Sequence, residues 1–217
     1  MTNQGTKGTK IISDTGKIVD YNNDQFFKFK RAAIPIDQLD KIVEYIDKLD
    51  LKWEDSVFGV DDTLDKNYRL SQHAWVEDES VKKYVMMQFQ SANADPDWRF
   101  DLNQIEDIQY TKYNATPEDQ DGVLGGHYDW HSDELIIPDS RICRKLSMTI
   151  MLSNSDEYEG GEFQFQCLRK GNIEYQSLTF EKGDVIVFPS IMNHCVNQVL
   201  SGTRKVLVAW AWGPLFK

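Results

Sequence analysis

The stretch GDVIVFPSIMNHCVNQVLSGTRKVLVAWAW, residues 183–212, contains two apolar runs, GDVIVFP and RKVLVAWAW. Both runs are rich in valine and other side chains that pack well on a pleated sheet. Each run is shorter than an ordinary helix, and proline, asparagine and glycine lie between the two. The stretch therefore predicts consecutive β-strands.

The same character extends back to about residue 99, where apolar residues alternate or cluster in short runs broken by turn residues. These further runs are DIQYTKY, RKLSMTIMLS, GEFQFQCLR and IEYQSLTF. A series of short strands of this kind is typical of an antiparallel barrel or jelly roll. We expect the jelly-roll core to occupy about residues 99–217.

Two helical patterns precede the strands. IPIDQLDKIVEYIDKLD, residues 34–50, places its isoleucines and leucines on one face, and Asp37 is a candidate N-cap. A second pattern, ESVKKYVMMQFQSAN, covers residues 79–93 and ends at the turn Asn-Ala-Asp-Pro. Helices followed by strands predict a mainly β domain with flanking helices (α+β), the N-terminal helices packing on one side.

Length and composition limit the organisation and the partners. A chain of 217 residues predicts one domain, over residues 26–217, after a flexible tail at residues 1–25. No apolar run is long enough to cross a membrane, so we expect a soluble protein. The net charge of −11 and the lack of a Lys/Arg cluster argue against a nucleic-acid or anionic membrane partner.

Cysteine usage predicts the compartment. Cys143, Cys167 and Cys195 are odd in number and scattered, which does not make a disulfide framework. The first residues lack the apolar region of a secretory signal. We therefore expect a reducing, cytoplasmic setting.

The stretch GGHYDWHSDE, residues 125–134, places His127, Asp129, His131 and Asp133 at every second position. In an extended chain these side chains point the same way, and the Cα atoms of residues two positions apart are about 6.6 Å from each other. A His and the Asp two positions after it can therefore share one metal ion. Two His and one carboxylate are the usual ligands of non-haem Fe(II), and His194 offers the third. The pattern leaves open which pair binds, and ordinary loop residues are the alternative.

A longer motif starts at His194. The residues after it follow the pattern H-x-V-x-x-V-x-x-G-x-R-x-x-x-x-x-W. With this motif, residues 105–213 resemble the prolyl-4-hydroxylase-type branch of the Fe(II)- and 2-oxoglutarate-dependent dioxygenases. The resemblance implies a double-stranded β-helix, the cupin-like jelly roll. It also implies Fe(II), with 2-oxoglutarate and O2 as cosubstrates and ascorbate as a further component.

The resemblance implies which residues bind the metal. In that family an aromatic residue stands three positions before the first metal histidine, and Tyr128 has this spacing before His131. The implied iron ligands are therefore His131, Asp133 and His194. The pocket, or the surroundings of the metal, is then left to Tyr128, His127 and Asp129, the last two being also the alternative metal pair.

Arg204 stands ten residues after His194, where the family has the basic residue that binds the far carboxylate of 2-oxoglutarate. A permanent cation in an apolar strand requires an anionic partner, and a structural ion pair is the alternative. Tyr113 is the expected second contact of 2-oxoglutarate, with Tyr110 as the alternative, although an insertion at residues 114–126 lengthens the family's spacing. Trp210 shares the strand face of Arg204, which predicts a pocket wall or plain core equally.

The implied activity is hydroxylation of an unactivated C–H bond, with a prolyl residue of a peptide or protein as the first candidate substrate. A free amino acid or another small metabolite is the second. A non-catalytic cupin-like binder of metal or sugar is a third, less favoured reading. Residues 51–75 and 114–126 are candidate substrate lids, His73 has no predicted role, and no oligomeric state is predicted.

Overall fold

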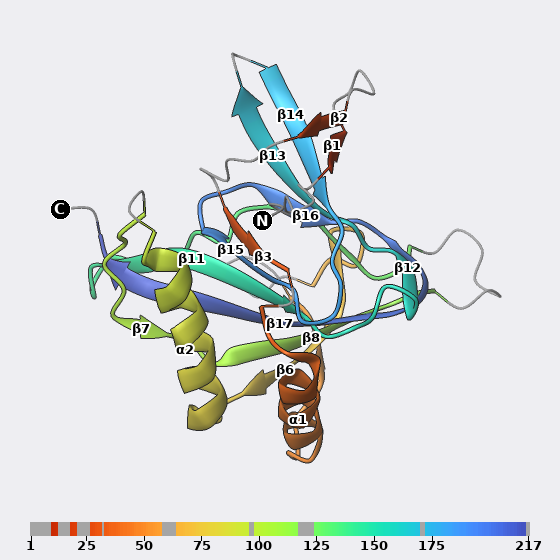
Figure 1. Cartoon of the computed structure of the whole chain (residues 1–217), viewed down its shortest axis with the longest axis horizontal. Coiled ribbons are helices and arrows are strands. Elements are labelled where there is room, and N and C mark those ends of the chain that lie inside the picture. The colour runs from red at the N-terminus through yellow and green to blue at the C-terminus, as the bar shows by residue number, and fades with distance from the viewer. Residues whose placement is uncertain are drawn as a thin grey trace, which may run out of the picture.

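The computed structural model describes residues 10–12, 18–20, 27–31, 33–57, 64–95, 98–116, 124–169 and 172–215. These residues form two helices, α1 (Ile36–Asp47) and α2 (Glu79–Asn93). Apart from the pair β1 (Lys10–Ile12) and β2 (Ile18–Asp20), their strands form two antiparallel sheets (Figure 1). This arrangement confirms the predicted jelly roll with helices.

The larger sheet has ten strands, and its main path runs β3–β15–β11–β17–β8–β6–β4. At its centre β17 (Val199–Pro214) pairs with β11 (Ile142–Met151) and β8 (Ile108–Asn114), so the run RKVLVAWAW lies in a strand that is paired on both sides. The other members are β3 (Lys28–Lys30), β4 (Glu54–Asp55), β6 (Gln72–Val76), β7 (Gln104–Ile105), β10 (Ile136–Ile137), β12 (Tyr158–Gly160) and β15 (Val185–Pro189).

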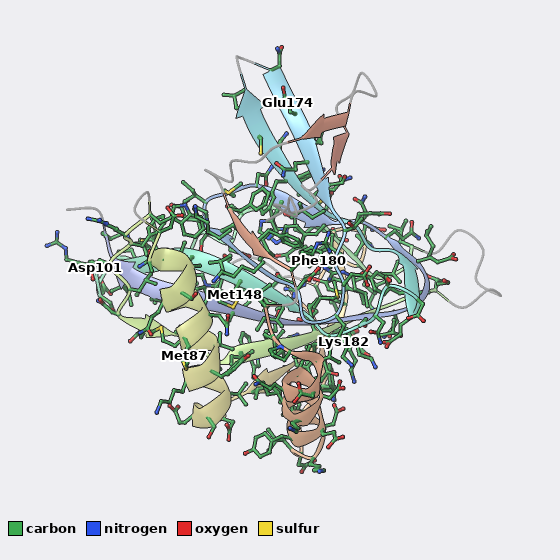
Figure 2. The ribbon with its side chains drawn as sticks, in the orientation of Figure 1. Met87, Asp101, Met148, Glu174, Phe180 and Lys182 are labelled. Carbon is green, nitrogen blue, oxygen red and sulfur yellow. The ribbon has the colours of Figure 1, made fainter. Side chains whose placement is uncertain are left out.

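The smaller sheet has five strands in the order β14–β13–β16–β9–β5. They are β5 (Arg69–Leu70), β9 (His127–His131), β13 (Phe163–Arg169), β14 (Asn172–Leu178) and β16 (His194–Val196). The hairpin of β13 and β14 stands out from the body of the molecule, and Glu174 lies near its tip (Figure 2). Both candidate metal histidines lie in this sheet.

The helices cover one face of the larger sheet. Leu39 and Ile46 of α1 and Val85 and Phe89 of α2 are fully or almost fully buried. They pack in one cluster with residues of β8, β11, β15 and β17, among them Met148, which Figure 2 shows at the centre of the sheet. Within the described residues, no helix has the length and apolar character that a membrane span requires.

The other face of the larger sheet packs on the smaller one. Phe163 and Phe165 of β13 contact Phe188 of β15, with ring centroids 5.8 and 5.0 Å apart. Val206 of β17 belongs to the same cluster. This aromatic core holds the two sheets together beside the candidate site.

Three features of the N-terminal half differ from the expectation or extend it. Asp37 does not cap α1, because the N-cap position is Pro35 and no side chain bonds there; Asp78 caps α2, accepting from the backbone N–H groups of Ser80 and Val81. Residues 51–75, one of the two candidate substrate lids, contain β4, β5 and part of β6. No apolar pattern predicts these strands from the sequence. β6, for example, is held by its pairing with β8. The predicted tail, residues 1–25, lies outside the described residues except for β1 and β2.

Replacing Phe89 with alanine is expected to lower the free energy of unfolding by about 3–5 kcal/mol, because the ring is fully buried between α2 and the sheet. Urea denaturation followed by circular dichroism measures the loss. Met87→Ala on the exposed face of the same helix serves as the control, because 56% of that residue is exposed. Equal losses in the two variants would contradict the packing described here.

Candidate active site

His131, Asp133 and His194 converge on one point. His131 ends β9 and lies opposite His194 of β16, while Asp133 follows β9 by two residues. One ligand atom from each residue lies within 4.8 Å of the others. The Nε2 atoms of His131 and His194 are 3.7 and 3.6 Å from the two oxygens of Asp133.

Backbone contacts orient both imidazoles. Nδ1 of His131 is 2.7 Å from the carbonyl oxygen of Asp129, and Nδ1 of His194 is 2.9 Å from that of Met192. Because a carbonyl oxygen only accepts, each Nδ1–H donates a hydrogen bond to its carbonyl, which leaves Nε2 facing the convergence point. Burial, followed by the neighbouring His194, lowers the pKa of His131 to about 3, so the ring is neutral.

Asp133 is held as a carboxylate. Burial alone would raise its pKa, but His194, His131 and Arg144 outweigh burial and lower the pKa below its usual value. Its backbone N–H donates to the carbonyl of Ser190 at 2.9 Å. Two imidazoles and one carboxylate, all on one side, form the donor set that suits a divalent metal with open positions.

These groups face a cavity of about 690 Å³ between the two sheets. Alternate residues of β17 form part of its wall, because side chains two apart on a strand share a face. These residues are Arg204, Val206, Val208 and Trp210. Trp210 is thus a wall residue of the cavity, the first of the two roles that its strand position allowed.

Arg204 is the most enclosed charge of this cavity, with 1% of its surface exposed. Burial lowers the pKa of its guanidinium. Its Nε and Nη2 atoms have no hydrogen-bond partner among the described residues. Gly161, at φ +64°, lies so close that an added Cβ would be 2.9 Å from Cδ of Arg204. Among the described residues, no anion compensates this buried cation. A carboxylate can bind a guanidinium through two parallel hydrogen bonds, so it suits this position.

The two tyrosine candidates point to opposite faces of β8. Tyr113 lies opposite Arg204 on β17, its ring 5.4 Å from the guanidinium, and lines the cavity. Tyr110 packs on the helix side of the sheet, with its ring 5.0 Å from that of Trp53. The structure therefore brings Tyr113 to Arg204 and keeps Tyr110 away. Of the insertion between Tyr113 and His131, residues 117–123 lie outside the described part.

Neither His127 nor Asp129 lines the cavity, so neither forms part of the pocket wall. Asp129 does lie beside a proposed metal ligand, because its carbonyl oxygen accepts from Nδ1 of His131. The ring nitrogens of His127 lie 2.8 and 2.9 Å from the carbonyl oxygens of Gly125 and Asn67. Asp129 is exposed and accepts from the backbone of Trp130. The reason is a break in register between β9 and β16, where two residues of β9, Asp129 and Trp130, lie opposite one residue of β16, Cys195. The bulge turns the side chains, so strict alternation fails.

Tyr128 does lie at the site. Its ring stacks on that of His131, with centroids 3.5 Å apart and an angle of 18° between the planes. The ring of Phe163 stacks in a similar way on His194, at 5.2 Å. Each candidate metal histidine is thus held by a backbone carbonyl and by an aromatic ring.

The cavity also contains residues that sequence reasoning missed. They are Arg69, His73, Trp75, Gln109 and Arg144. Arg144 forms a bidentate pair with Glu106, at 2.6 and 2.8 Å, and its guanidinium lies 4.2 Å from the Trp210 ring. His73 accepts or donates a 3.0 Å hydrogen bond with Ser56. No local pattern marks these residues, because their strands meet only in the folded chain.

Comparisons with known proteins agree with this geometry. Residues 108–212 match the model of the 2OG-Fe(II) oxygenase superfamily. PKHD-type hydroxylases from two Synechococcus strains, CC9902 and CC9605, are 38% and 40% identical over 87 and 86 residues. Each match covers 40% of this chain and 36% of the relative, so the chain aligns with about a third of these curated relatives' length.

Solved structures share the fold. A prolyl-4-hydroxylase from Pseudomonas putida superposes with a TM-score of 0.60 at 19% identity, covering 85% of this chain and 91% of that one. A Trichoplax adhaerens prolyl hydroxylase, solved with a hypoxia inducible factor peptide, gives 0.58 at 15%, covering 87% and 84%. The fold and site define a jelly-roll protein with a His–Asp–His centre. Over residues 108–212 the chain resembles the 2OG-Fe(II) oxygenase superfamily, and its fold is that of the solved prolyl hydroxylases.

Proposed function

We propose that the protein is an Fe(II)- and 2-oxoglutarate-dependent dioxygenase that hydroxylates an unactivated C–H bond. One observation carries the proposal. The convergent set His131, Asp133 and His194 faces the same cavity as Arg204, a buried cation with two nitrogens that lack partners among the described residues. A metal set and an anion anchor in one cavity are what a metal-bound dicarboxylate cosubstrate needs.

In this proposal His131, Asp133 and His194 hold Fe(II) through Nε2, a carboxylate oxygen and Nε2. The three groups suit a divalent ion. Nδ1–H bonds orient both rings, and the carboxylate of Asp133 stays ionised. Bound Fe(II) supplies the redox chemistry that couples oxidative decarboxylation of 2-oxoglutarate by O2 to oxygen insertion into a C–H bond.

Arg204 and Tyr113 position the cosubstrate. The two unpartnered nitrogens of Arg204 receive the far carboxylate of 2-oxoglutarate, and Tyr113 stands beside them on the neighbouring strand. Val206 and Val208 line the same wall and keep water from the centre. Trp210, farther along β17, then bounds the space that the substrate occupies.

The first candidate substrate is a prolyl residue of a peptide or protein. The names of the relatives, PKHD-type hydroxylase and prolyl-4-hydroxylase, support this choice. A free amino acid or another small metabolite is the second candidate. We place the protein in the cytoplasm, because Cys143, Cys167 and Cys195 form no disulfide in the described part of the chain.

The test is turnover of 2-oxoglutarate by the protein supplied with Fe(II), ascorbate and air. We expect succinate to form slowly without a substrate and faster with one. Mass spectrometry of proline-containing peptides and free amino acids should then reveal the gain of one oxygen atom in the substrate. The Zn(II)-loaded protein is the matched control and should be inactive. A protein that binds Fe(II) and 2-oxoglutarate but forms no succinate under any of these conditions would contradict the proposal.

A further inference from the structure

Arg69 is a second buried cation in the cavity that faces the candidate metal centre. It lies on β5, and 9% of the residue is exposed. Its guanidinium is 4.4 Å from the ring centroid of Tyr128, whose ring stacks on His131. One aromatic ring therefore separates Arg69 from a proposed metal ligand. Arg204 enters the same cavity from the other sheet, on β17.

Among the described residues, only neutral acceptors hold Arg69. Its Nη1 donates to the carbonyl of Val57 at 2.7 Å, its Nη2 to Oε1 of Gln109 at 3.0 Å, and its Nε to Oγ of Ser71 at 3.3 Å. A guanidinium has more N–H groups than these three contacts use. The neutral acceptors fix its plane and leave its charge uncompensated.

In the part of the chain that the structure describes, no carboxylate oxygen lies within ion-pair distance of Arg69. Two other arginines of the described residues, Arg144 and Arg31, form ordinary ion pairs. Arg144 meets both oxygens of Glu106, and Arg31 lies 2.6 Å from Asp184. Burial of an unpaired charge is costly. A buried arginine in a cavity wall without a carboxylate partner therefore indicates that an anion binds there.

The acidic residues at the cavity mouth do not neutralise Arg69. Glu134, Glu54 and Asp55 line the cavity, but Glu134 is exposed and the side chains of Glu54 and Asp55 are each 47% exposed. Glu54 pairs with Lys52, and Asp55 lies 3.3 Å from Lys66. Their charges are thus paired and screened by water, whereas that of Arg69 is enclosed.

Charge balance points the same way. With Fe(II) and the 2-oxoglutarate dianion bound, the enclosed charges are the metal, the cosubstrate, Asp133, Arg204 and Arg69, together with the ion pair of Arg144 and Glu106, which is neutral as a whole. The positive charges among them exceed the negative charges by one. A substrate with one carboxylate near Arg69 restores neutrality in a cavity of low dielectric constant, where an imbalance is costly.

We propose that Arg69 binds a carboxylate of the substrate and so makes the enzyme selective for an anionic substrate. This inference rests on the dioxygenase function proposed above. The carboxylate has two possible sources, the α-carboxylate of a free amino acid or an acidic side chain beside the hydroxylated residue of a peptide. Both present the same planar anion to the guanidinium.

The experiment uses the Fe(II)-loaded protein and substrates in matched pairs. L-proline and L-prolinamide form one pair; the capped tripeptides acetyl-Glu-Pro-Glu-amide and acetyl-Gln-Pro-Gln-amide form the other. The members of a pair have the same shape and differ in charge. We expect the carboxylate member of one pair to have at least about a thirtyfold higher kcat/KM, and the pair that responds identifies the source.

Three variants assign this preference to Arg69. Arg69→Gln is expected to remove most of the carboxylate preference, and Arg69→Lys, which keeps the charge, to retain part of it. Arg31→Gln removes one positive charge from a side chain that is 46% exposed and should keep the preference in full. Because the ratio within a pair is measured on one preparation, a loss of folded protein in a variant does not change it.

Several results would overturn the inference. The wild type could prefer the amide members, or use both members of each pair equally well. Arg69→Gln could lower kcat/KM for both members of a pair by the same factor. It could also raise the half-saturating 2-oxoglutarate concentration without changing the preference, which would assign Arg69 to the cosubstrate. Calorimetry that finds no binding of any carboxylate member to the Mn(II)-loaded, 2-oxoglutarate-saturated protein would also end it.

A separate measurement distinguishes this failure from that of the proposed function. Succinate formed from 2-oxoglutarate without any substrate reports the dioxygenase reaction alone. Succinate formation without a carboxylate preference contradicts only the role of Arg69. A complete lack of 2-oxoglutarate consumption contradicts the dioxygenase itself.

Discussion

His131→Ala is expected to lower the affinity for Mn(II), used as an air-stable stand-in for Fe(II), by at least about 100-fold. Loss of a group that merely supports a metal ligand costs about 10- to 100-fold, and His131 is itself one of three proposed ligands. Its Nε2 faces Asp133 and His194, and the remaining two residues cannot complete the set. Succinate formation should fall below detection. Isothermal titration with Mn(II) and metal analysis of the purified protein measure the effect.

His127→Ala is the matched control, since it removes the same side chain from the same strand. Both nitrogens of His127 face backbone carbonyls, away from the cavity, so the variant should bind Mn(II) as the wild type does. A modest loss of stability is expected instead. If His127→Ala lost the metal while His131→Ala kept it, the assignment along β9 would be wrong by four residues.

Arg204→Met is expected to raise the half-saturating concentration of 2-oxoglutarate by at least about 100-fold. Removing one partner of an enclosed charge pair typically costs 2–5 kcal/mol or more, which is roughly 30- to several thousand-fold in affinity. Arg204→Lys keeps the charge but not the planar pair of donors, so an intermediate value is expected. Succinate formation at increasing 2-oxoglutarate concentrations measures both variants.

Arg204→Met should weaken 2-oxoglutarate binding without lowering the stability of the free protein. Without 2-oxoglutarate, Arg204 is a buried cation with unpartnered nitrogens, so methionine at this position should leave the stability unchanged or raise it. Urea unfolding of the metal-free protein measures this. A strong loss of stability together with an unchanged response to 2-oxoglutarate would make Arg204 a structural residue and not an anchor.

Local sequence patterns determined the elements that build the core. Alternating or clustered apolar residues marked β8, β11, β13, β14, β15 and β17, and helical spacing marked α1 and α2. These patterns are reliable because each element must bury one face, and that face is written into its own residues. The spacing from Tyr128 to His131 and from His194 to Arg204 also pointed to the residues that converge in the cavity.

Strand pairing determined the parts that the sequence left open. The sequence favours Tyr113 and keeps Tyr110 as the alternative, whereas the register of β8 on β17 places Tyr113 beside Arg204. His127 and His131 each stand two residues before an aspartate, so the sequence does not distinguish them by this spacing. The bulge between β9 and β16 turns His127 away from the cavity. Register is a relation between two strands, so one strand's residues do not contain it.

The sequence by itself determined that this chain is a jelly roll with a candidate His–Asp–His centre and an arginine downstream of it. Only the tertiary structure decided that Arg69, from a polar stretch without a recognisable pattern, is enclosed beside that centre without an anion among the described residues. The physical reason is that apolar periodicity reports the burial of a face, whereas the pairing of a charge depends on neighbours that are brought together from distant strands.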